Sequence, residues 1–409
     1  MIIQKIKEKY EIKLSIIIPL YNSKKTIIKC LNSIFLQEQN WIEVIIINDC
    51  SKDSSLKLVK NFINTKHINN LKIINCKKNI GPGECRNLGL KISEGHFVTF
   101  LDSDDFLVKN SLKNIKNYLE NDWDLIINNT ERKKNPKNNS FFFKQFKSKK
   151  FVNNNYIQKS IAGELHFNEC WKIIAKRANI VKKKIYFPNL YIGEDQCFIN
   201  KLILNSQKIF LNRNVFLHHT DNSKGLSSMN EQQEMLSNLN IINFLKKLKF
   251  KNNLQKEFIN QKIQILKNTI AILALSYSLI KITKITKNYK AFFKNYLIKI
   301  YKENDKFIKK IVKYLKLHKP DIFIYGKNNL AKSLSAKLKK IKIKVQYIFD
   351  DNSKFKLKTI SNYKFINLNK KIFIITINDK YKSQIVANKI KKLKIKNYEI
   401  FDLHKLLKW

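Results

Sequence analysis

Short runs of β-branched and aromatic residues recur along the first part of the chain, and each run ends abruptly in polar or turn-forming residues. The clearest runs cover residues 14–19, 44–47, 71–74 and 97–101. Continuous apolar runs of this length are typical of strands that are buried on both faces of a sheet. Between these runs, apolar residues recur at helical spacing, as Ile27, Leu31 and Ile34 do. Strands that alternate with helices predict a parallel, Rossmann-like sheet.

The starts of the intervening helices are marked by polar residues. Asn22 or Ser23 is expected to cap a helix that ends near Gln37, and residues 51–54 are expected to open the next one. A third helix is expected over residues 84–92, after a turn that contains two glycines and a proline.

Residues 124–128 predict one more strand, and the segment after them changes in composition. Residues 131–150 are rich in lysine and asparagine and contain Pro136. Such a segment is expected to be a mobile loop or an insertion.

The remainder of the chain divides into a helical part and a tail. Residues 229–317 show little but helical periodicity, with an apolar stripe at Phe307, Ile311 and Leu315. A helical bundle packed on the first domain is expected, and an amphipathic lysine-rich face resting on an anionic membrane is the alternative. Lys319 and Pro320 mark a boundary. The expected domains cover residues 1–228, 229–318 and 319–409.

The tail repeats the alternation of strand and helix, with strands expected at residues 322–325, 345–349 and 372–377. This pattern predicts a small Rossmann-like α/β domain. At the first turn, Gly326 is the one glycine kept of the three in the dinucleotide-binding fingerprint. Because the second glycine lets the backbone approach a pyrophosphate, we expect no bound NAD.

The composition excludes a disordered chain, and it weakens the interpretation of the positive charge as a sign of a nucleic-acid partner. The chain has 409 residues, of which 44% are apolar, and a formal net charge of +49. Such a charge suggests nucleic acid or an anionic surface as a partner. However, only four of the 80 basic residues are arginine, the preferred residue for bidentate recognition of phosphates and bases. We therefore expect no nucleic-acid partner, whereas attraction to an anionic inner-membrane surface remains an expectation.

The six cysteines show neither a Cys-x-x-Cys pair nor the spacing of a zinc site. They are expected to be reduced, mostly buried thiols of a cytosolic protein. The first residues lack the apolar segment of a signal peptide, and the apolar-leaning run at 270–280 is too short to span a bilayer. The expected location is the cytoplasm, either in solution or at the cytoplasmic face of the inner membrane.

Three carboxylates, those of Asp102, Asp104 and Asp105, follow directly on the apolar run at 97–101. Like charges this close repel one another unless a cation intervenes. A hard divalent ion, Mg²⁺ or Mn²⁺, binds through one or two carboxylates plus substrate phosphates, and ligands of open α/β sheets bind at the carboxyl ends of strands. The alternative is an acidic turn in which Asp105 caps the next helix.

Four motifs, in order, resemble those of family-2 glycosyltransferases. They are Pro-Leu-Tyr-Asn at 19–22, Ile-Asn-Asp-Cys-Ser at 47–51, Asn-Ile-Gly-Pro-Gly-Glu-Cys-Arg-Asn-Leu-Gly at 79–89 and Leu-Asp-Ser-Asp-Asp at 101–105. The resemblance covers about residues 12–225. It implies a GT-A fold, in which a Rossmann-like mixed sheet binds a nucleotide-sugar donor, and transfer with inversion at the anomeric carbon. The fold class is therefore α/β: a GT-A sheet, a helical segment and a small Rossmann-like domain.

The resemblance also implies roles for individual residues on the donor side. Asp49 would contact the base or ribose, Tyr21 would lie near the base, and Asp102 would face the ribose. Asp104 would ligate the metal, with Asp102 and His219 as further contacts, and Arg86 would help to hold the donor. The residues expected to bind the nucleotide-sugar are Pro19, Tyr21, Asn22, Asp49, Arg86 and Asp102. Tyr21 could instead serve packing, and Arg86 could pair with Glu84 or Asp49.

On the acceptor side, Gly-Glu-Asp at 193–195 resembles the family motif whose aspartate is the catalytic base. An inverting transfer needs one carboxylate to take the proton of the acceptor hydroxyl, and Asp195 is expected to do so, with Glu194 orienting it or contacting the acceptor. The same three residues also fit the start of a helix. Trp171 and His166 are expected to line the acceptor site, although a buried tryptophan is more often part of the core.

Together these observations predict a metal-dependent, inverting glycosyltransferase that uses Mn²⁺ or Mg²⁺. It would move a sugar from a nucleotide donor, UDP being the first choice, to a glycan or lipid-linked glycan of the cell surface. Two alternatives remain at this point: a sugar nucleotidyltransferase with a related sheet, and a non-catalytic basic scaffold on anionic lipid or nucleic acid. The first normally carries a Gly-rich basic loop where this chain has Pro19 to Asn22, and the second has no use for an acidic cleft.

Overall fold

The structure is a computed structural model, and it divides by contacts into two compact units. The first unit joins residues 1–228 to 244–259, and the second joins residues 229–243 to 260–409. The domain boundaries expected at 228 and 318 stay predictions. The residues that the structure describes are 11–37, 40–133, 139–141, 148–162, 165, 167–190, 192–220, 231–274, 321–325, 345–349, 371–375 and 398–402.

The first unit is built on a ten-stranded mixed sheet of order β3-β2-β1-β4-β9-β6-β10-β5, with β7 paired to β6 and β8 to β10. Its parallel half confirms the strands expected from the apolar runs. These strands are β1 (Leu14–Leu20), β2 (Ile42–Asn48), β3 (Leu71–Asn75) and β4 (Phe97–Phe100). Neighbours β2, β1 and β4 run in the same direction, so their carboxyl ends lie at one edge of the sheet.

The other half of the sheet contains antiparallel pairs, in which β9 joins β4 to β6 and β10 pairs with β5 and β8. Its strands are β5 (Phe106–Leu107), β6 (Leu125–Lys133), β7 (Asn139–Phe141), β8 (Lys149–Val152), β9 (Ile173–Lys176) and β10 (Lys208–Thr220). The expectation of a loop over 131–150 is therefore wrong in part. The end of β6, all of β7 and the start of β8 lie in that segment, because β10, distant in sequence, pairs with the end of β6 and with β8, and β6 pairs in turn with the nearby β7.

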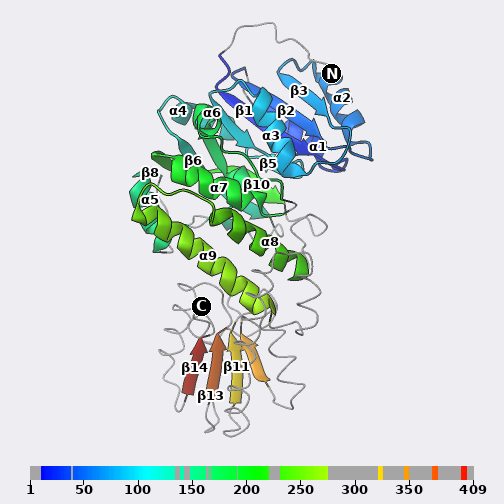
Figure 1. The fold of residues 1–409 in the computed structure, drawn as a ribbon. Coiled ribbons are helices and arrows are strands. Elements are labelled where there is room, and N and C mark those ends of the chain that lie inside the picture. Colours follow the sequence, from blue (N-terminus) through cyan, green and yellow to red (C-terminus); the bar gives the residue numbers. More distant parts are fainter. Residues whose placement is uncertain are drawn as a thin grey trace. The chain divides into compact units, whose positions relative to one another are not determined.

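Helices cover the parallel half, with α3 packed on β1 and β2, and α1 packed on β5 and α2 (Figure 1). The helices of this unit are α1 (Ile27–Phe35), α2 (Ser55–Lys66), α3 (Pro82–Ile92), α4 (Ser111–Leu119), α5 (Asn153–Ile161), α6 (Arg177–Lys182) and α7 (Glu194–Asn205). Helix α1 begins at Ile27, later than expected, and its start has no side-chain cap. Asn22 has a φ of 50°, and the Ser23 carbonyl accepts hydrogen bonds from Thr26 and Ile27, so these residues form a turn instead.

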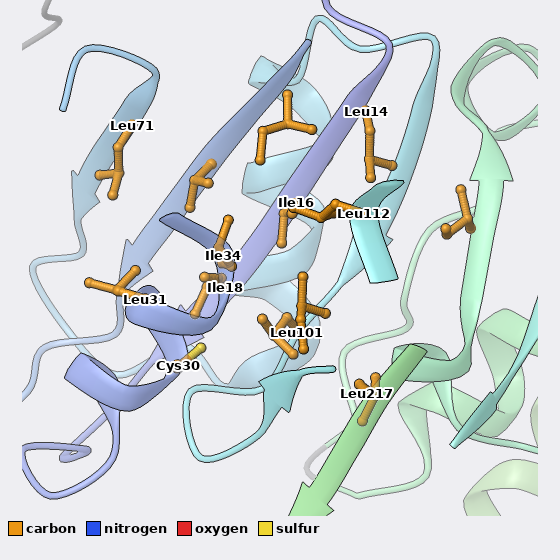
Figure 2. Packing of buried hydrophobic residues seen from close by; sticks show 14 of the residues in the cluster. Leu14, Ile16, Ile18, Cys30, Leu31, Ile34, Leu71, Leu101, Leu112 and Leu217 are labelled. Carbon is orange, nitrogen blue, oxygen red and sulfur yellow. The ribbon is translucent and has the colours of Figure 1, made fainter. Parts of the chain in front are cut away.

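The core of this unit lies between the sheet and these helices. Alternate residues of β1, such as Ile16 and Ile18, pack against Leu31 and Ile34 of α1, and all four side chains are fully buried (Figure 2). Burying one such side chain stabilises the fold by roughly 1.5–3 kcal/mol. This packing fixes the strand ends that carry the polar motifs.

The second half of the chain confirms the expected element types where the structure describes it. Two helices, α8 (Glu231–Leu245) and α9 (Asn253–Ala274), occupy the expected helical region. A separate parallel sheet has the order β12-β11-β13-β14. Its strands are β11 (Asp321–Tyr325), β12 (Val345–Phe349), β13 (Lys371–Ile375) and β14 (Tyr398–Asp402). The stripe at Phe307 and the turn at Gly326 lie outside the described residues.

The strand order places β11 between β12 and β13, as in doubly wound α/β folds, where the chain reverses its direction of winding at the first strand. The strand β14 was not expected from the sequence. Within the described residues, no helix combines the length and the apolar character needed to cross a membrane.

Candidate active site

The polar motifs meet at the carboxyl edge of the parallel strands. Tyr21 follows β1, Asp49 follows β2, and Asp102 follows β4 by two residues. Since these strands are neighbours in the sheet, the three side chains come from adjacent positions along one edge. This edge is where open α/β sheets bind their ligands.

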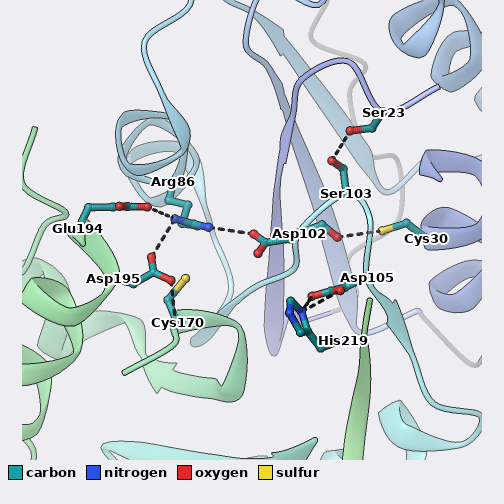
Figure 3. Close-up of polar contacts among 10 residues, drawn as sticks. All are labelled: Ser23, Cys30, Arg86, Asp102, Ser103, Asp105, Cys170, Glu194, Asp195 and His219. Atoms are coloured by element: carbon teal, nitrogen blue, oxygen red, sulfur yellow. Dashed lines mark hydrogen bonds and ion pairs between the residues drawn. The ribbon is translucent and has the colours of Figure 1, made fainter. Parts of the chain in front are cut away.

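Arg86 of α3 joins three carboxylates that the sequence places in two different motifs (Figure 3). Its Nη2 donates to Asp102 Oδ1 at 2.8 Å, and its Nη1 lies 3.0 Å from both Glu194 Oε1 and Asp195 Oδ1. The Arg86 side chain is 4% exposed. The alternative pairing of Arg86 with Glu84 or Asp49 is therefore wrong, and the guanidinium links the acidic turn after β4 to the start of α7.

Electrostatics explain why this buried guanidinium stays charged. Burial by itself would lower the pKa of Arg86, but the neighbouring carboxylates, with Asp195 first, outweigh burial and raise it well above its ordinary value. The ring of Phe187 also lies beneath the guanidinium, at 5.4 Å from Cζ to the ring centroid. Phe187 in turn stacks on Phe198 at 4.0 Å, so an aromatic pair supports the arginine from α7.

One guanidinium faces three carboxylates, so the cluster holds an excess of negative charge. Burial raises the pKa of Glu194 to about 7, with the Asp195 charge as the next cause. Burial also raises the pKa of Asp195. Asp195 accepts a further hydrogen bond from the Cys170 backbone at 3.4 Å. Both acids open α7, whose first turn favours negative charge. Glu194 and Asp195 therefore both form the expected acidic pair and begin the helix that was expected at the same residues.

The acidic turn after β4 does not cap a helix, because β5 follows it and the next helix, α4, begins at Ser111. Asp105 instead accepts from His219 Nδ1 at 3.0 Å and from the Thr220 backbone at 2.8 Å. Burial is the main cause that raises the pKa of Asp105, to about 6. The contact fixes His219 beside the turn.

His219 also stacks on Trp171, with the ring centroids 4.6 Å apart and the planes at 8°. Its neighbour His218 has different partners: Nδ1 lies 2.7 Å from Glu131, and the ring lies 4.8 Å from Phe106. The two histidines therefore face in different directions, as expected for adjacent residues of a strand.

The residue types around the acidic turn suit a divalent metal. Asp102 and Asp104 supply hard oxygen ligands, and Asp104 is half-buried in the turn. His219 is held through Nδ1 by Asp105, so Nε2 is the ring nitrogen through which it would ligate a cation. A buried carboxylate that orients an imidazole in this way is the usual support of a metal-ligating histidine.

The loops after β1 and β2 and the start of α3 bind one another at this edge. Asn22 Oδ1 accepts from the Lys52 backbone at 2.8 Å, which ties the loop after β1 to the loop after β2. Asp49 accepts from the backbones of Ile80 and Gly81 at 2.6 and 3.0 Å, which ties the loop after β2 to the start of α3.

The remaining expected residues take different positions. Tyr21 is 45% exposed, so packing does not account for it. Pro19 is half-buried within β1. Trp171 is buried and contacts His219, so it belongs to the core and borders the site. His166 lies outside the described residues.

Sequence reasoning missed two features of this site. One is Asp105 as the partner of His219, which lies 114 positions away along the chain. The other is the contact between the Ser23 and Ser103 hydroxyls at 2.6 Å, which joins the loop after β1 to the acidic turn. Neither contact has a local sequence signal, since both depend on strands brought together by the fold.

Residues 15–180 match the family model of glycosyl transferase family 2. They form a family-2 glycosyltransferase domain. A curated relative is the poly(ribitol-phosphate) beta-N-acetylglucosaminyltransferase TarS of Staphylococcus aureus, 33% identical over 202 residues, which are 48% of this chain and 33% of TarS. Glycosyltransferase GlyG of Streptococcus pneumoniae is 24% identical over 214 residues, which are 50% of this chain and 70% of GlyG. The chain thus spans about a third of the length of TarS.

Solved structures show the same fold. The crystal structure of S. aureus TarS residues 1–349 with UDP-GlcNAc matches with a TM-score of 0.51 and 24% identity, over 70% of this chain and 79% of that one. The corresponding complex with UDP matches with a TM-score of 0.52 and 22% identity, over 74% and 91% of the two chains. The expected GT-A fold of the family-2 glycosyltransferase domain is confirmed.

Proposed function

We propose that this chain is an inverting glycosyltransferase that moves a sugar from a UDP-linked donor to a hydroxyl of a surface glycan, with Mn²⁺ or Mg²⁺. The observation that carries the proposal is the Arg86 cluster, in which Arg86 bonds Asp102, Glu194 and Asp195. Through one guanidinium, Asp102 of the donor motif and Asp195 of the base motif lie on the two sides of a single site. A transfer reaction needs this arrangement, because the donor and the acceptor must meet at one anomeric carbon.

Asp195 is the general base of the proposed reaction. Its carboxylate takes the proton of the acceptor hydroxyl as that oxygen forms a bond to the anomeric carbon. The bond from the anomeric carbon to the diphosphate oxygen breaks, and the nucleoside diphosphate leaves with the electron pair. Attack from the face opposite the leaving group inverts the anomeric configuration. Glu194 and Arg86 hold the base in position.

Asp102, Asp104 and His219 would hold the metal at the acidic turn. A bound divalent cation would stabilise the negative charge that develops on the leaving diphosphate. Tyr21 is exposed at the neighbouring strand end and Asp49 lies in the adjacent loop, so the nucleoside is assigned to this side of the edge. Asn22 and Pro19 are assigned to the same side.

The names of the relatives support the choice of donor and acceptor. TarS is named for the transfer of N-acetylglucosamine to poly(ribitol-phosphate), and GgaB of Bacillus subtilis, 26% identical over 226 residues, is named a minor teichoic acid biosynthesis protein. A surface-glycan acceptor places the reaction at the cytoplasmic face of the membrane, where the positive charge of the chain would favour anionic lipid.

The test is release of the nucleoside diphosphate from a panel of nucleotide sugars, with Mn²⁺ and with EDTA, in the presence of glycan acceptors. We expect metal-dependent release from a UDP-sugar, and loss of that release in Asp195→Asn and Asp104→Ala. Asp122→Asn is the control, since Asp122 is an exposed residue paired with Lys176 and Lys208. Absence of release, together with absence of metal-dependent UDP binding by calorimetry, would overturn the proposal.

A further inference from the structure

Asp49 also belongs to a second cluster, in which it lies beside two cysteines, Cys76 and Cys85. Cys76 directly follows β3, and Cys85 lies in the first turn of α3. A carboxylate oxygen of Asp49 and the two Sγ atoms all lie within 4.8 Å of one another. The nine-residue spacing of the cysteines hides the cluster from the sequence, since it matches no short metal-binding pattern.

The ligand chemistry of this cluster differs from that of the acidic turn. Two sulfur atoms and one carboxylate form a mixed set that suits Zn²⁺ and other thiophilic divalent ions rather than Mg²⁺. With metal–ligand bonds of about 2.0–2.3 Å, tetrahedral ligand atoms are roughly 3.3–3.8 Å apart. The ligand atoms, which lie within 4.8 Å of one another, would draw together around a bound ion.

The backbone already holds the ligands in place. The carboxylate of Asp49 accepts from the Ile80 and Gly81 backbones, which orients it while each oxygen keeps a further lone pair. The Cys76 backbone donates to Asn48 at 2.9 Å, and the Cys85 backbone donates to Gly81 at 3.1 Å. Asp49 and Cys85 are thus tied to Gly81, and Cys76 is tied to the last residue of β2.

The charge balance of the cluster favours a cation. Burial first, and then the Asp49 charge, raise the pKa of the Cys85 thiol, and the same two causes raise the pKa of Cys76. Both thiols are therefore protonated when no cation is present, and they are poor nucleophiles, which argues against a redox role. A divalent ion would displace these protons and neutralise the ligand charge. Cys85 is fully buried and Cys76 is half-buried, so an ion can enter from the Cys76 side.

We infer that Asp49, Cys76 and Cys85 form a site for one thiophilic divalent cation such as Zn²⁺, with water as the fourth ligand. The bound ion would pin residues 76–85 to the end of β2. A regulatory consequence rests on the function proposed above: because Asp49 is assigned to the donor, a bound Zn²⁺ would compete with UDP.

The site is tested by titrating the full chain, reduced with a phosphine and freed of metal, with Co²⁺. We expect a thiolate-to-cobalt charge-transfer band in the near ultraviolet that saturates at about one ion per chain and disappears on addition of Zn²⁺. Cys76→Ser and Cys85→Ser should abolish the band. Cys85→Ala, which places no polar atom in the buried position, is the second variant, and circular dichroism checks that each variant is folded.

Cys50→Ser is the matched control. Its thiol lies in the adjacent loop but donates to the Lys77 carbonyl and is not among the clustered ligand atoms. We expect the band to persist in this variant. Absence of the band in the wild-type chain, its persistence in Cys76→Ser and Cys85→Ala, or its loss in Cys50→Ser would each overturn the inferred site.

The competition with UDP has a separate readout. Calorimetric UDP binding in the presence of Mn²⁺ should weaken by about tenfold or more when Zn²⁺ is added to the wild-type chain, and should not weaken in Cys85→Ala. Equal weakening in both chains would assign the Zn²⁺ effect to the acidic turn and overturn the competition. If UDP does not bind at all, the proposed function fails, whereas the cobalt spectrum still decides the metal site.

Discussion

Arg86 Nη2 donates to Asp102 Oδ1 at 2.8 Å, and this contact joins the end of β4 to helix α3. The other terminal nitrogen of the same guanidinium contacts Glu194 and Asp195. A planar, forked cation holds carboxylates on two sides in a fixed geometry, whereas the rotatable donors of an ammonium group fix no such geometry. Arg86 therefore fixes the distance between the acidic turn after β4 and the start of α7.

Arg86→Lys should lower kcat of the proposed transfer by about 100-fold or more, because a small misplacement of reacting groups has an effect of this size. Lysine keeps the charge but loses the fork, so Asp195 would no longer be held against Asp102. Arg86→Met, which leaves three carboxylates without their cation, should lower the free energy of unfolding by about 3–5 kcal/mol. Steady-state kinetics and urea denaturation measure the two effects.

Arg177→Lys is the matched control for these variants. Arg177 is a half-buried arginine that donates to Ser93 Oγ at 3.1 Å, away from the cluster. It should keep kcat within a few-fold of the wild-type value. Equal kcat in Arg86→Lys and Arg177→Lys would contradict the positioning role of Arg86.

The parallel half of the sheet could be predicted from the sequence because its signals are local. Strands β1 to β4 are dense apolar runs, and the polar residues at their ends mark one edge of the sheet. Strands β7 and β8 could not be predicted in the same way. They are short and polar, and pairing with β6 and β10 holds them in the sheet.

The details of the site were harder to predict for the same reason. The Ser23 backbone donates to Ser55 Oγ at 2.7 Å, and the Ser23 hydroxyl contacts Ser103. These tertiary contacts use the residue that local rules assign to a helix cap, so α1 begins later. The residue types of the site were visible in the sequence, whereas their pairing depended on the fold.

The Arg86 cluster should make kcat/KM of the proposed reaction depend on pH. The coupled acids Glu194 and Asp195 have raised pKa values, with burial as the main cause, and that of Glu194 is about 7. The base must be ionised to accept a proton, so kcat/KM should rise with pH through a limb near neutrality that belongs to the pair. Glu194→Gln removes one charge and should move this limb to lower pH. An unchanged limb in the variant would contradict the coupling.

The free energy of unfolding should change with pH in the direction opposite to kcat/KM. The pKa of Glu194 is about 7 in the folded chain against an ordinary value of 4.5, so the folded state binds more protons between these values. The free energy of unfolding should therefore fall as pH rises from about 4.5 to 7 through this group. Glu194→Gln should flatten that part of the curve, which urea denaturation at several pH values would show. A curve as steep as that of the wild-type chain would assign the dependence to other groups.

The adjacent histidines His218 and His219 allow a direct test of the metal site proposed at the acidic turn. His219→Gln should raise the Mn²⁺ concentration for half-maximal activity by about 10–100-fold, since His219 is held by Asp105 beside the acidic turn. His218→Gln is the control, because His218 is the next residue of the same strand but contacts Glu131. Titration of activity with Mn²⁺ measures both. A larger shift in the His218 variant would place the metal on the other face of β10.

Two glycines of α3 should separate activity from stability. A Cβ at Gly83 would lie 3.0 Å from Glu194 Cγ and 3.4 Å from Phe187 Cβ, so Gly83→Ala should displace the acid beside the base without changing any charge. We expect kcat to fall by about tenfold or more, with a smaller effect on KM. The measurement is steady-state kinetics at saturating donor.

Gly89→Ala is the counterpart, because its Cβ would overlap the side chain of Ile17 in β1, within the core. Overpacking of this kind should lower the free energy of unfolding by about 1–3 kcal/mol while kcat of the remaining folded chain stays close to the wild-type value. Urea denaturation and kinetics on the same samples distinguish the two variants. If Gly89→Ala lowered kcat as much as Gly83→Ala, the effect would come from a shift of the whole helix, and the close approach of Gly83 to Glu194 would have no separate role in catalysis.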